Sequence, residues 1–165
     1  MTFEELEQSL PNGFHDATLL QVSLDSVERC ATVKISVHVS ADGDQDQELY
    51  CVGILEAKSV SLFFMEPPDP NYRFALSGSG IGVSGDSVAL GQNPEIDLLL
   101  RQLPSDATAY RFFLEEWNSF FYLAASEVAS SWQENATSLA TSEERHSSHG
   151  KYGNTSPRMG SVEKR

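Results

Sequence analysis

The segment VKISVHVS (residues 33–40) indicates the fold class most clearly. Its four branched apolar residues alternate strictly with polar ones. Because successive side chains of a strand point to opposite faces, this period of two predicts a half-buried β-strand. The preceding run, residues 19–24, alternates less regularly, and the residues between them, 25–29, are few enough for a hairpin turn. The centre of the chain is therefore expected to be an antiparallel pair.

Further strand-forming segments follow this pair. Residues 49–65 are β-branched and aromatic and predict one bent strand or two, stopped by Pro67, Pro68 and Pro70. The glycine-rich residues 77–87 fit either a loop or a short strand through Ile81 and Val83. The aromatic segment AYRFFLEEWNSFFYLAAS, residues 109–126, has apolar residues at helical spacing, but two aromatic runs separated by residues 115–118 favour a hairpin.

Two short helices are expected beside the strands. Thr2 and Glu5 have the spacing of a capping box for a helix over residues 2–10, which ends at Pro11-Asn12-Gly13. Asn93-Pro94-Glu95 begins a helical turn over residues 95–101. We therefore predict an α+β fold, mainly antiparallel β-sheet with a short N-terminal helix. The predicted core consists of Leu19, Val33, Ile35, Val37, Ile54, Leu62, Phe64, Phe112 and Phe121.

The composition changes near Ser130. Residues 1–130 contain 20 acidic and 6 basic residues, whereas residues 131–165 contain 4 acidic and 5 basic ones. The latter part is rich in serine and threonine and has no sustained apolar period, so it cannot bury enough surface to offset its ordering entropy. We predict a β-rich domain over 1–130 and a disordered Ser/Thr-rich tail over 131–165.

The net charge of the chain disfavours two classes of binding partner. The chain of 165 residues has a formal charge of -13 and a pI of about 4.5, so its field repels nucleic-acid phosphates and anionic lipid headgroups. We therefore expect neither a nucleic-acid nor a membrane partner. The acidic start lacks the basic and apolar regions of a secretory signal, which favours a cytoplasmic protein. Cys30 and Cys51 have no metal-site spacing, and we expect no cofactor, no metal and no disulfide between them.

Two motifs imitate known ligand sites without meeting their requirements. Residues 80–85 match GxGxxG, but no helix is expected directly after them and no basic residue lies nearby, so we interpret them as a turn in a glycine-rich loop. The acidic residues 42–48 alternate carboxylates as a calcium loop does, yet Gln47 and Gly53 occupy positions that need Gly and Glu. A solvated acidic loop is the preferred interpretation, with weak Ca²⁺ binding as the alternative.

Two groups of residues are candidates for a functional site. His15 and Asp16 could supply a general base and an orienting carboxylate, although neighbours in an extended chain point to opposite faces, and Asp16 equally fits a structural role in a turn. Glu115, Glu116, Trp117 and Asn118 form the second group. An exposed Trp beside acids would suit a basic protein partner, and the alternative is a Trp that packs over the end of the core.

Three segments resemble a group of small uncharacterised bacterial proteins. They are LPNGFHDATLLQVSLD (residues 10–25), MEPPDP (65–70) and FFLEEWNSFFYLAA (112–125). His15, Asp16, Pro67, Pro68, Trp117 and Asn118 match the pattern of that group. The start of the chain is similar, more loosely, to immunity-like proteins of bacterial polymorphic toxin systems. The resemblance implies a bacterial, cytosolic, antiparallel β domain and transfers no catalytic residue.

These observations favour a non-enzymatic protein-binding module, an immunity-like inhibitor of a basic toxin. An acidic surface complements a basic groove and accelerates encounter with it. Two alternatives remain open from the residues alone. One is a small-ligand or weak Ca²⁺-binding module, and the other is an enzyme that uses His15 and Asp16.

Overall fold

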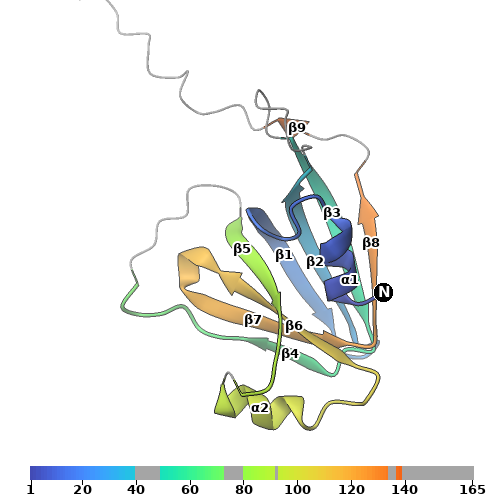
Figure 1. The fold of residues 1–165 in the computed structure, drawn as a ribbon, viewed down its shortest axis with the longest axis vertical. Helices are drawn as coiled ribbons and strands as arrows, with labels where there is room; N and C mark the ends of the chain where they lie inside the picture. The colour runs from blue at the N-terminus through green and yellow to red at the C-terminus, as the bar shows by residue number, and fades with distance from the viewer. Residues whose placement is uncertain (40–48, 73–79, 92, 134–136, 139–165) are drawn as a thin grey trace, which may run out of the picture.

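The computed structural model describes residues 1–39, 49–72, 80–91, 93–133 and 137–138. Among these residues the dominant feature is one antiparallel sheet with two short helices outside it (Figure 1). The helices are α1 (Phe3–Ser9) and α2 (Pro94–Leu100), and a 3-10 turn, η1, spans Glu115–Trp117. The strands are β1 (Ala17–Asp25), β2 (Cys30–His38), β3 (Leu49–Lys58), β4 (Leu62–Met65), β5 (Ile81–Ser87), β6 (Thr108–Leu114), β7 (Ser119–Ala125), β8 (Glu127–Trp132) and β9 (Thr137–Ser138). The predicted fold class is confirmed in this form.

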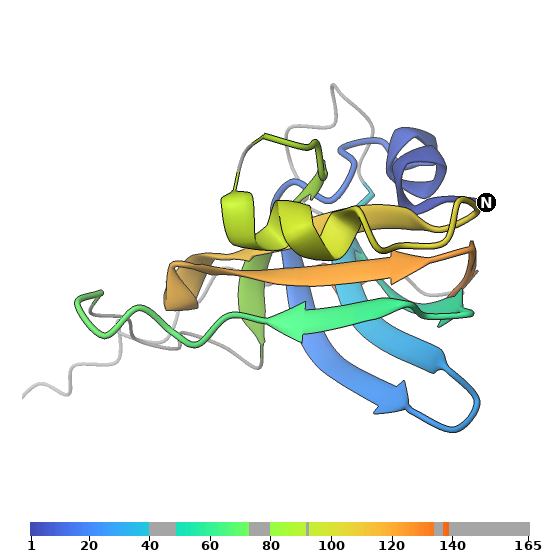
Figure 2. The same ribbon diagram turned by 90° about the horizontal axis from the view of Figure 1, so that it is seen from below.

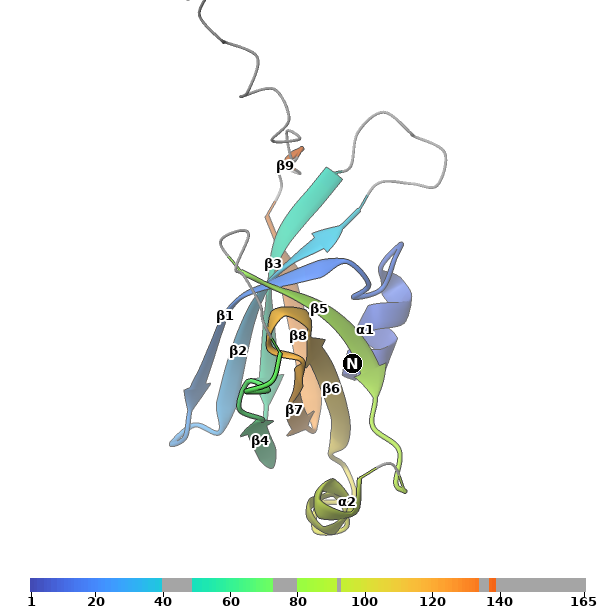
Figure 3. The same ribbon diagram turned by 90° about the vertical axis from the view of Figure 1, so that its left-hand side faces the viewer.

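The sheet folds back on itself. Its strand order is β4-β7-β6-β5-β1-β2-β3-β8, and β9 pairs with the start of β3. Along the chain, β3 is followed directly by β4, and β7 is followed directly by β8. Since β3 pairs with β8 and β4 pairs with β7, these two ladders are parts of one long, bent hairpin. At the bend, the Ser61 N–H donates to the Ala124 carbonyl and the Ser126 N–H to the Lys58 carbonyl. The two ends of the sheet are therefore joined, and the sheet curves around an interior (Figure 3). The core residues fill this interior.

The core is lined by the inward faces of the strands. β2 follows the predicted alternation over its full length, and its inward residues Ala31, Val33, Ile35 and Val37 are completely buried. Each Val or Ile contributes about 1.5–3 kcal/mol by leaving water. The aromatic part of the core joins Phe14, Tyr110, Phe112 and Phe121 in contacts with ring centroids 5.1–5.9 Å apart.

α1 covers one open end of the curved sheet. Thr2 is its N-cap and forms a capping box with Glu5, as the sequence predicts. Phe3 and Leu6, spaced i to i+3, are the buried residues of this helix, and Phe3 stacks on Tyr110. The helix ends at Leu10, whose extended backbone is the conformation favoured before proline.

The predicted core is wrong at three positions: Ile54, Leu62 and Phe64. Leu62 is only partly buried and pairs with Ala124 on the outer face of the sheet. Ile54 and Phe64 are 39% and 38% exposed, whereas their neighbours Leu55 and Phe63 face inward. Residues 49–55 are apolar almost without interruption, so their sequence does not indicate which side chains face the core. The pairing with β2 determines which face is buried, because residues opposite each other share a face of the sheet. Leu55 lies opposite the buried Val33, and Ile54 lies opposite Lys34.

The structure decides the expectations for three strand segments. The segment 49–65 forms two strands, one of the two expected alternatives, with Ser59 in a left-handed conformation at the bend. Residues 81–87 form strand β5, so the interpretation of GxGxxG as a turn is wrong. β8 continues past the boundary expected at residue 130 to Trp132, because the Trp132 ring lies against Gly53 of β3, where a Cβ would come within 2.4 Å of it. The hairpin over β6 and β7 is as predicted.

α2 lies on the outside of the β4–β7–β6 layer, away from α1 (Figure 2). Asn93 caps its start by accepting from the Glu95 and Ile96 N–H groups, and Pro94 occupies the first turn, where a missing N–H costs nothing. Ile96, Tyr122 and Ala124 are buried but lie outside the main core. α2 therefore covers a second, smaller apolar area on the outer face of the sheet.

Three other features bear on the predictions. Cys30 and Cys51 are free thiols. Within the described ranges, neither helix has the length and apolar content that a bilayer crossing requires. The acidic residues 42–48 and the tail beyond residue 138 lie outside the described residues.

Candidate functional site

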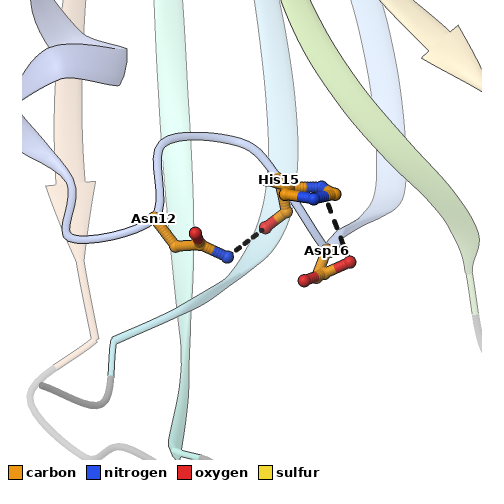
Figure 4. Close-up of polar contacts among 3 residues, drawn as sticks. All are labelled: Asn12, His15 and Asp16. Carbon is orange, nitrogen blue, oxygen red and sulfur yellow. Dashed lines mark hydrogen bonds and ion pairs between the residues drawn. The ribbon is translucent and has the colours of Figure 1, made fainter. Parts of the chain in front are cut away.

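His15 and Asp16 lie together in the turn that precedes β1. His15 Nδ1 is 3.6 Å from Asp16 Oδ1, and the Asn12 side-chain amide donates to the His15 carbonyl (Figure 4). Asp16 has a φ of 58°, so the chain here is a turn rather than extended, and the expectation that the two side chains point apart is wrong. Both side chains are well exposed, at 71% and 63%. An ion pair between two side chains that are this exposed to water contributes little to stability.

The second candidate group lies two strands away from this pair. In the sheet, Ala17 pairs with Val83, and Val83 pairs with Leu114, which places one row of buried residues between the two groups. Asp16 precedes this row on β1 and Glu115 follows it on β6. β1 and β6 are each antiparallel to β5 and therefore run in the same direction. A residue before β1 and a residue after β6 consequently extend from the row in opposite directions. The fold therefore does not bring His15 and Asp16 into one site with Glu115–Asn118.

The acids of η1 are held against β5. The Gly82 N–H donates to Glu116 Oε2 over 2.7 Å, and a Cβ at Gly82 would come within 2.7 Å of Glu115 Oε2. Glycine at this position lets the carboxylates approach the strand backbone. Glu115 stays exposed while Glu116 is partly buried. These acids thus have a structural role in fixing the turn as well as contributing negative charge.

Trp117 and Asn118 join the turn to the proline-rich segment after β4. Trp117 is partly buried and packs against the main core, as the alternative interpretation of this residue predicts. Its carbonyl accepts from the Asp69 N–H over 2.9 Å. Asn118 is the residue in the left-handed region that ends η1, and its side-chain amide donates to Asp69 Oδ2 over 2.9 Å. The turn and the segment Glu66–Pro70 therefore form one connected unit.

Asp69 is the centre of this connection. Its carboxylate accepts from the Asn71 N–H over 2.8 Å and from the Asn118 amide. These hydrogen bonds, the backbone one first, favour the charged form and hold the pKa of Asp69 below its ordinary value. Asp69 is consequently a fixed negative charge at neutral pH.

Glu66 anchors the other end of the segment on β7. Its N–H donates to the Phe120 carbonyl, while its carboxylate accepts from the Phe120 N–H over 3.0 Å and from the Tyr122 hydroxyl over 3.3 Å. Burial, followed by the nearby Glu66 carboxylate, raises the pKa of Tyr122, so its hydroxyl stays a donor. The segment between Glu66 and Asp69, with prolines at 67 and 68, is therefore tied down at both ends.

A groove lies between this segment and α2. Its volume is about 870 Å³, and it is open to solvent. Its apolar lining comes from three parts of the chain: Phe64 on β4, the prolines that follow it, and Ile96, Leu98 and Leu99 on α2. Phe64, Leu98 and Leu99 are 38%, 64% and 39% exposed, so the groove gathers three large apolar side chains that are left in water. Asn118 and Ser119 extend it toward the β6–β7 turn.

The groove has a negative rim. Glu66, Asp69 and Glu95 line it, and its described lining contains no Lys, Arg or His. On the same outer face of the sheet, Arg111 lies with its guanidinium 5.0 Å from the Phe120 ring and pairs with Asp86 over 2.7 Å. Because that cation already has an acidic partner, it does little to offset the charge of the rim.

Only some of the residues that line this groove were expected from the sequence to be functional. Asn118 was a candidate, and the proline segment and the helical turn near residue 95 were both expected, but nothing placed them side by side. The exposed Leu98 and Leu99, two apolar residues on a short amphipathic helix, are the signal in the sequence that could have indicated an uncovered surface. Among the described residues, no group of three or more His, Cys, Asp or Glu side chains is arranged to hold a metal ion.

Comparisons with protein-family models, with curated proteins and with solved structures found no match to this chain.

Proposed function

We propose that the protein is a non-enzymatic binding module for a basic protein, acting in the cytoplasm as an immunity-like inhibitor of a basic toxin. The observation that carries the proposal is the groove beside α2, which combines exposed apolar residues with an acidic rim. Protein interfaces have apolar anchors at their centre and polar groups around them. The excess of acidic over basic residues in 1–130 adds a long-range attraction for a cationic partner.

The alternatives have weaker support. His15 and Asp16 contact each other on an open turn, where their side chains are 71% and 63% exposed. An enzyme normally excludes water from its reacting groups. The acidic residues 42–48, on which the Ca²⁺-binding alternative rests, lie outside the described residues.

The test is co-purification of the tagged full chain from its native host at low salt, with mass spectrometry of the proteins that elute as salt is raised. We expect one basic protein, and its purified form should bind more weakly as ionic strength increases. A lone protein, or a partner whose affinity ignores salt, would contradict the proposal. Activity of the chain alone on small substrates, lost in His15→Ala, would favour the enzyme alternative.

A further inference from the structure

We infer that the groove between α2 and the segment Glu66–Pro70 binds a chain segment of the partner in which apolar anchors are flanked by lysine or arginine. This inference rests on the proposed function and assigns it a place on the surface. It is carried by three properties of the groove: its size and openness, its fixed wall, and the combination of apolar lining with one sign of charge.

The size and shape favour a chain segment over a small metabolite. A volume of about 870 Å³ holds several side chains. Sites for small molecules usually enclose most of the ligand surface, whereas this groove is open along one side. An open apolar groove is the geometry by which proteins bind a helix or an extended segment of another chain.

The wall of the groove is already in place without a partner. Pro67, Pro68 and Pro70 have restricted backbones, and hydrogen bonds from Glu66 to β7 and from Asp69 to the β6–β7 turn fix both ends of this wall. The opposite wall is α2, whose first turn is capped by Asn93. A surface that is ordered before binding loses little entropy when a partner docks.

The lining specifies what the segment must carry. Phe64 and Leu98, together with Leu99, offer exposed apolar area that a Leu or Phe anchor would cover. The carboxylates of Glu66, Asp69 and Glu95 repel an acidic segment and attract Lys or Arg beside the anchor. A purely basic segment would leave the apolar area uncovered, and a purely apolar one would leave the charges unpaired.

The test uses a synthetic peptide with leucine and phenylalanine anchors flanked by lysines, and a second peptide in which glutamate replaces each lysine. We expect the basic peptide alone to shift the amide signals of α2 and of residues 64–71 in NMR spectra of the full chain. Leu98→Ser and Glu95→Lys should each weaken its binding about tenfold, which corresponds to about 1.4 kcal/mol.

Two variants at the β1–β2 turn are matched controls. Val27 is 86% exposed and Glu28 is exposed, and both lie away from the groove. Val27→Ser removes an exposed apolar side chain as Leu98→Ser does, and Glu28→Lys changes the net charge as Glu95→Lys does. We expect both controls to bind the basic peptide like the wild-type chain. Equal losses in the groove and control variants, or signal shifts elsewhere, would overturn the inference.

The outcomes separate this inference from the proposed function. If a basic protein co-purifies but binds Leu98→Ser and Glu95→Lys as tightly as the wild-type chain, the function holds and the groove is not its site. If the peptide binds the groove as expected but no basic protein co-purifies, the groove inference holds and the proposed function fails.

Discussion

Asn118 makes two separate contributions to the structure. It takes the left-handed conformation that ends η1, with a φ of 46°, and its amide donates to Asp69. A residue with a Cβ other than Asn or Asp loses roughly 1–2 kcal/mol in this region relative to glycine. One side chain therefore shapes the turn and ties it to the wall of the groove.

Two substitutions separate these contributions. Asn118→Gly keeps the backbone conformation and loses the hydrogen bond, which should lower the free energy of unfolding by about 1 kcal/mol. Asn118→Ala loses both and should cost about 2 kcal/mol or more. Urea unfolding of the two variants measures the difference. Equal losses would show that the left-handed conformation adds no strain for alanine.

Asp69 should make stability depend on pH in the acid range. Its folded-state pKa lies below the ordinary value of 3.8, so its contribution is present above that value and is lost as the pH falls through the folded-state pKa. The charge-removing change Asp69→Asn should therefore lower the free energy of unfolding at neutral pH, and the difference from wild type should shrink below about pH 3.8. A difference that is constant with pH would contradict this account.

Strand β3 shows what determines which face of a strand is buried. Where β2 alternates between apolar and polar residues, its buried face follows from the sequence. Residues 49–55 lack that alternation, and only Glu56 and Lys58 mark an outward face. The pairing of Leu55 with Val33 then decides which face is buried. Local patterns thus predicted the helices, β2 and the β6–β7 hairpin, but not which face of β3 is buried.

Neighbouring residues of β3 provide a matched pair of variants. Leu55→Ala opens a cavity in the core and should lower the free energy of unfolding by about 2–5 kcal/mol. Ile54→Ala removes a side chain that is 39% exposed on the other face and should cost less than about 1.5 kcal/mol. Denaturant unfolding measures both. Comparable losses would mean that β3 is buried on both faces.

β8 runs to Trp132, two residues past the boundary expected at residue 130. Trp132 pairs with Gly53 and covers it, and Ser131 pairs with Ile54. A chain that ends at residue 130 loses both pairs, the ring, the hydrogen bond from the Gln133 N–H to the Val52 carbonyl and the pairing of β9 with β3. It should therefore unfold at a lower urea concentration than a chain that ends at residue 138. Equal midpoints for the two chains would show that residues 131–138 add nothing to stability.

The groove beside α2 arises only from tertiary structure. Its lining comes from residues 64–70, 93–102 and 118–119, which the antiparallel pairing of β4 with β7 and the position of α2 bring together. The charge and the apolar content of each part were visible in the sequence, but their convergence was not. The same applies to His15 and Asp16, whose contact depends on one left-handed residue.

The net charge of the molecule should affect the rate of association. If a cationic partner is steered by the excess of acidic residues, raising the ionic strength should slow association strongly and change dissociation little. Stopped-flow or surface-based kinetics with the purified partner measure the two rates. A salt effect confined to dissociation would mean that long-range attraction has no part in binding.

In our proposal, the chain recognises a basic protein through the groove beside α2. The most direct measurement is co-purification at low salt with four versions of the full chain in parallel: wild type, Val27→Ser, Leu98→Ser and Glu95→Lys. Our account predicts that wild type and Val27→Ser retain the same basic protein, and that the two groove variants lose most of it while keeping the wild-type melting temperature within a few degrees. Retention of that protein by all four versions would contradict the account.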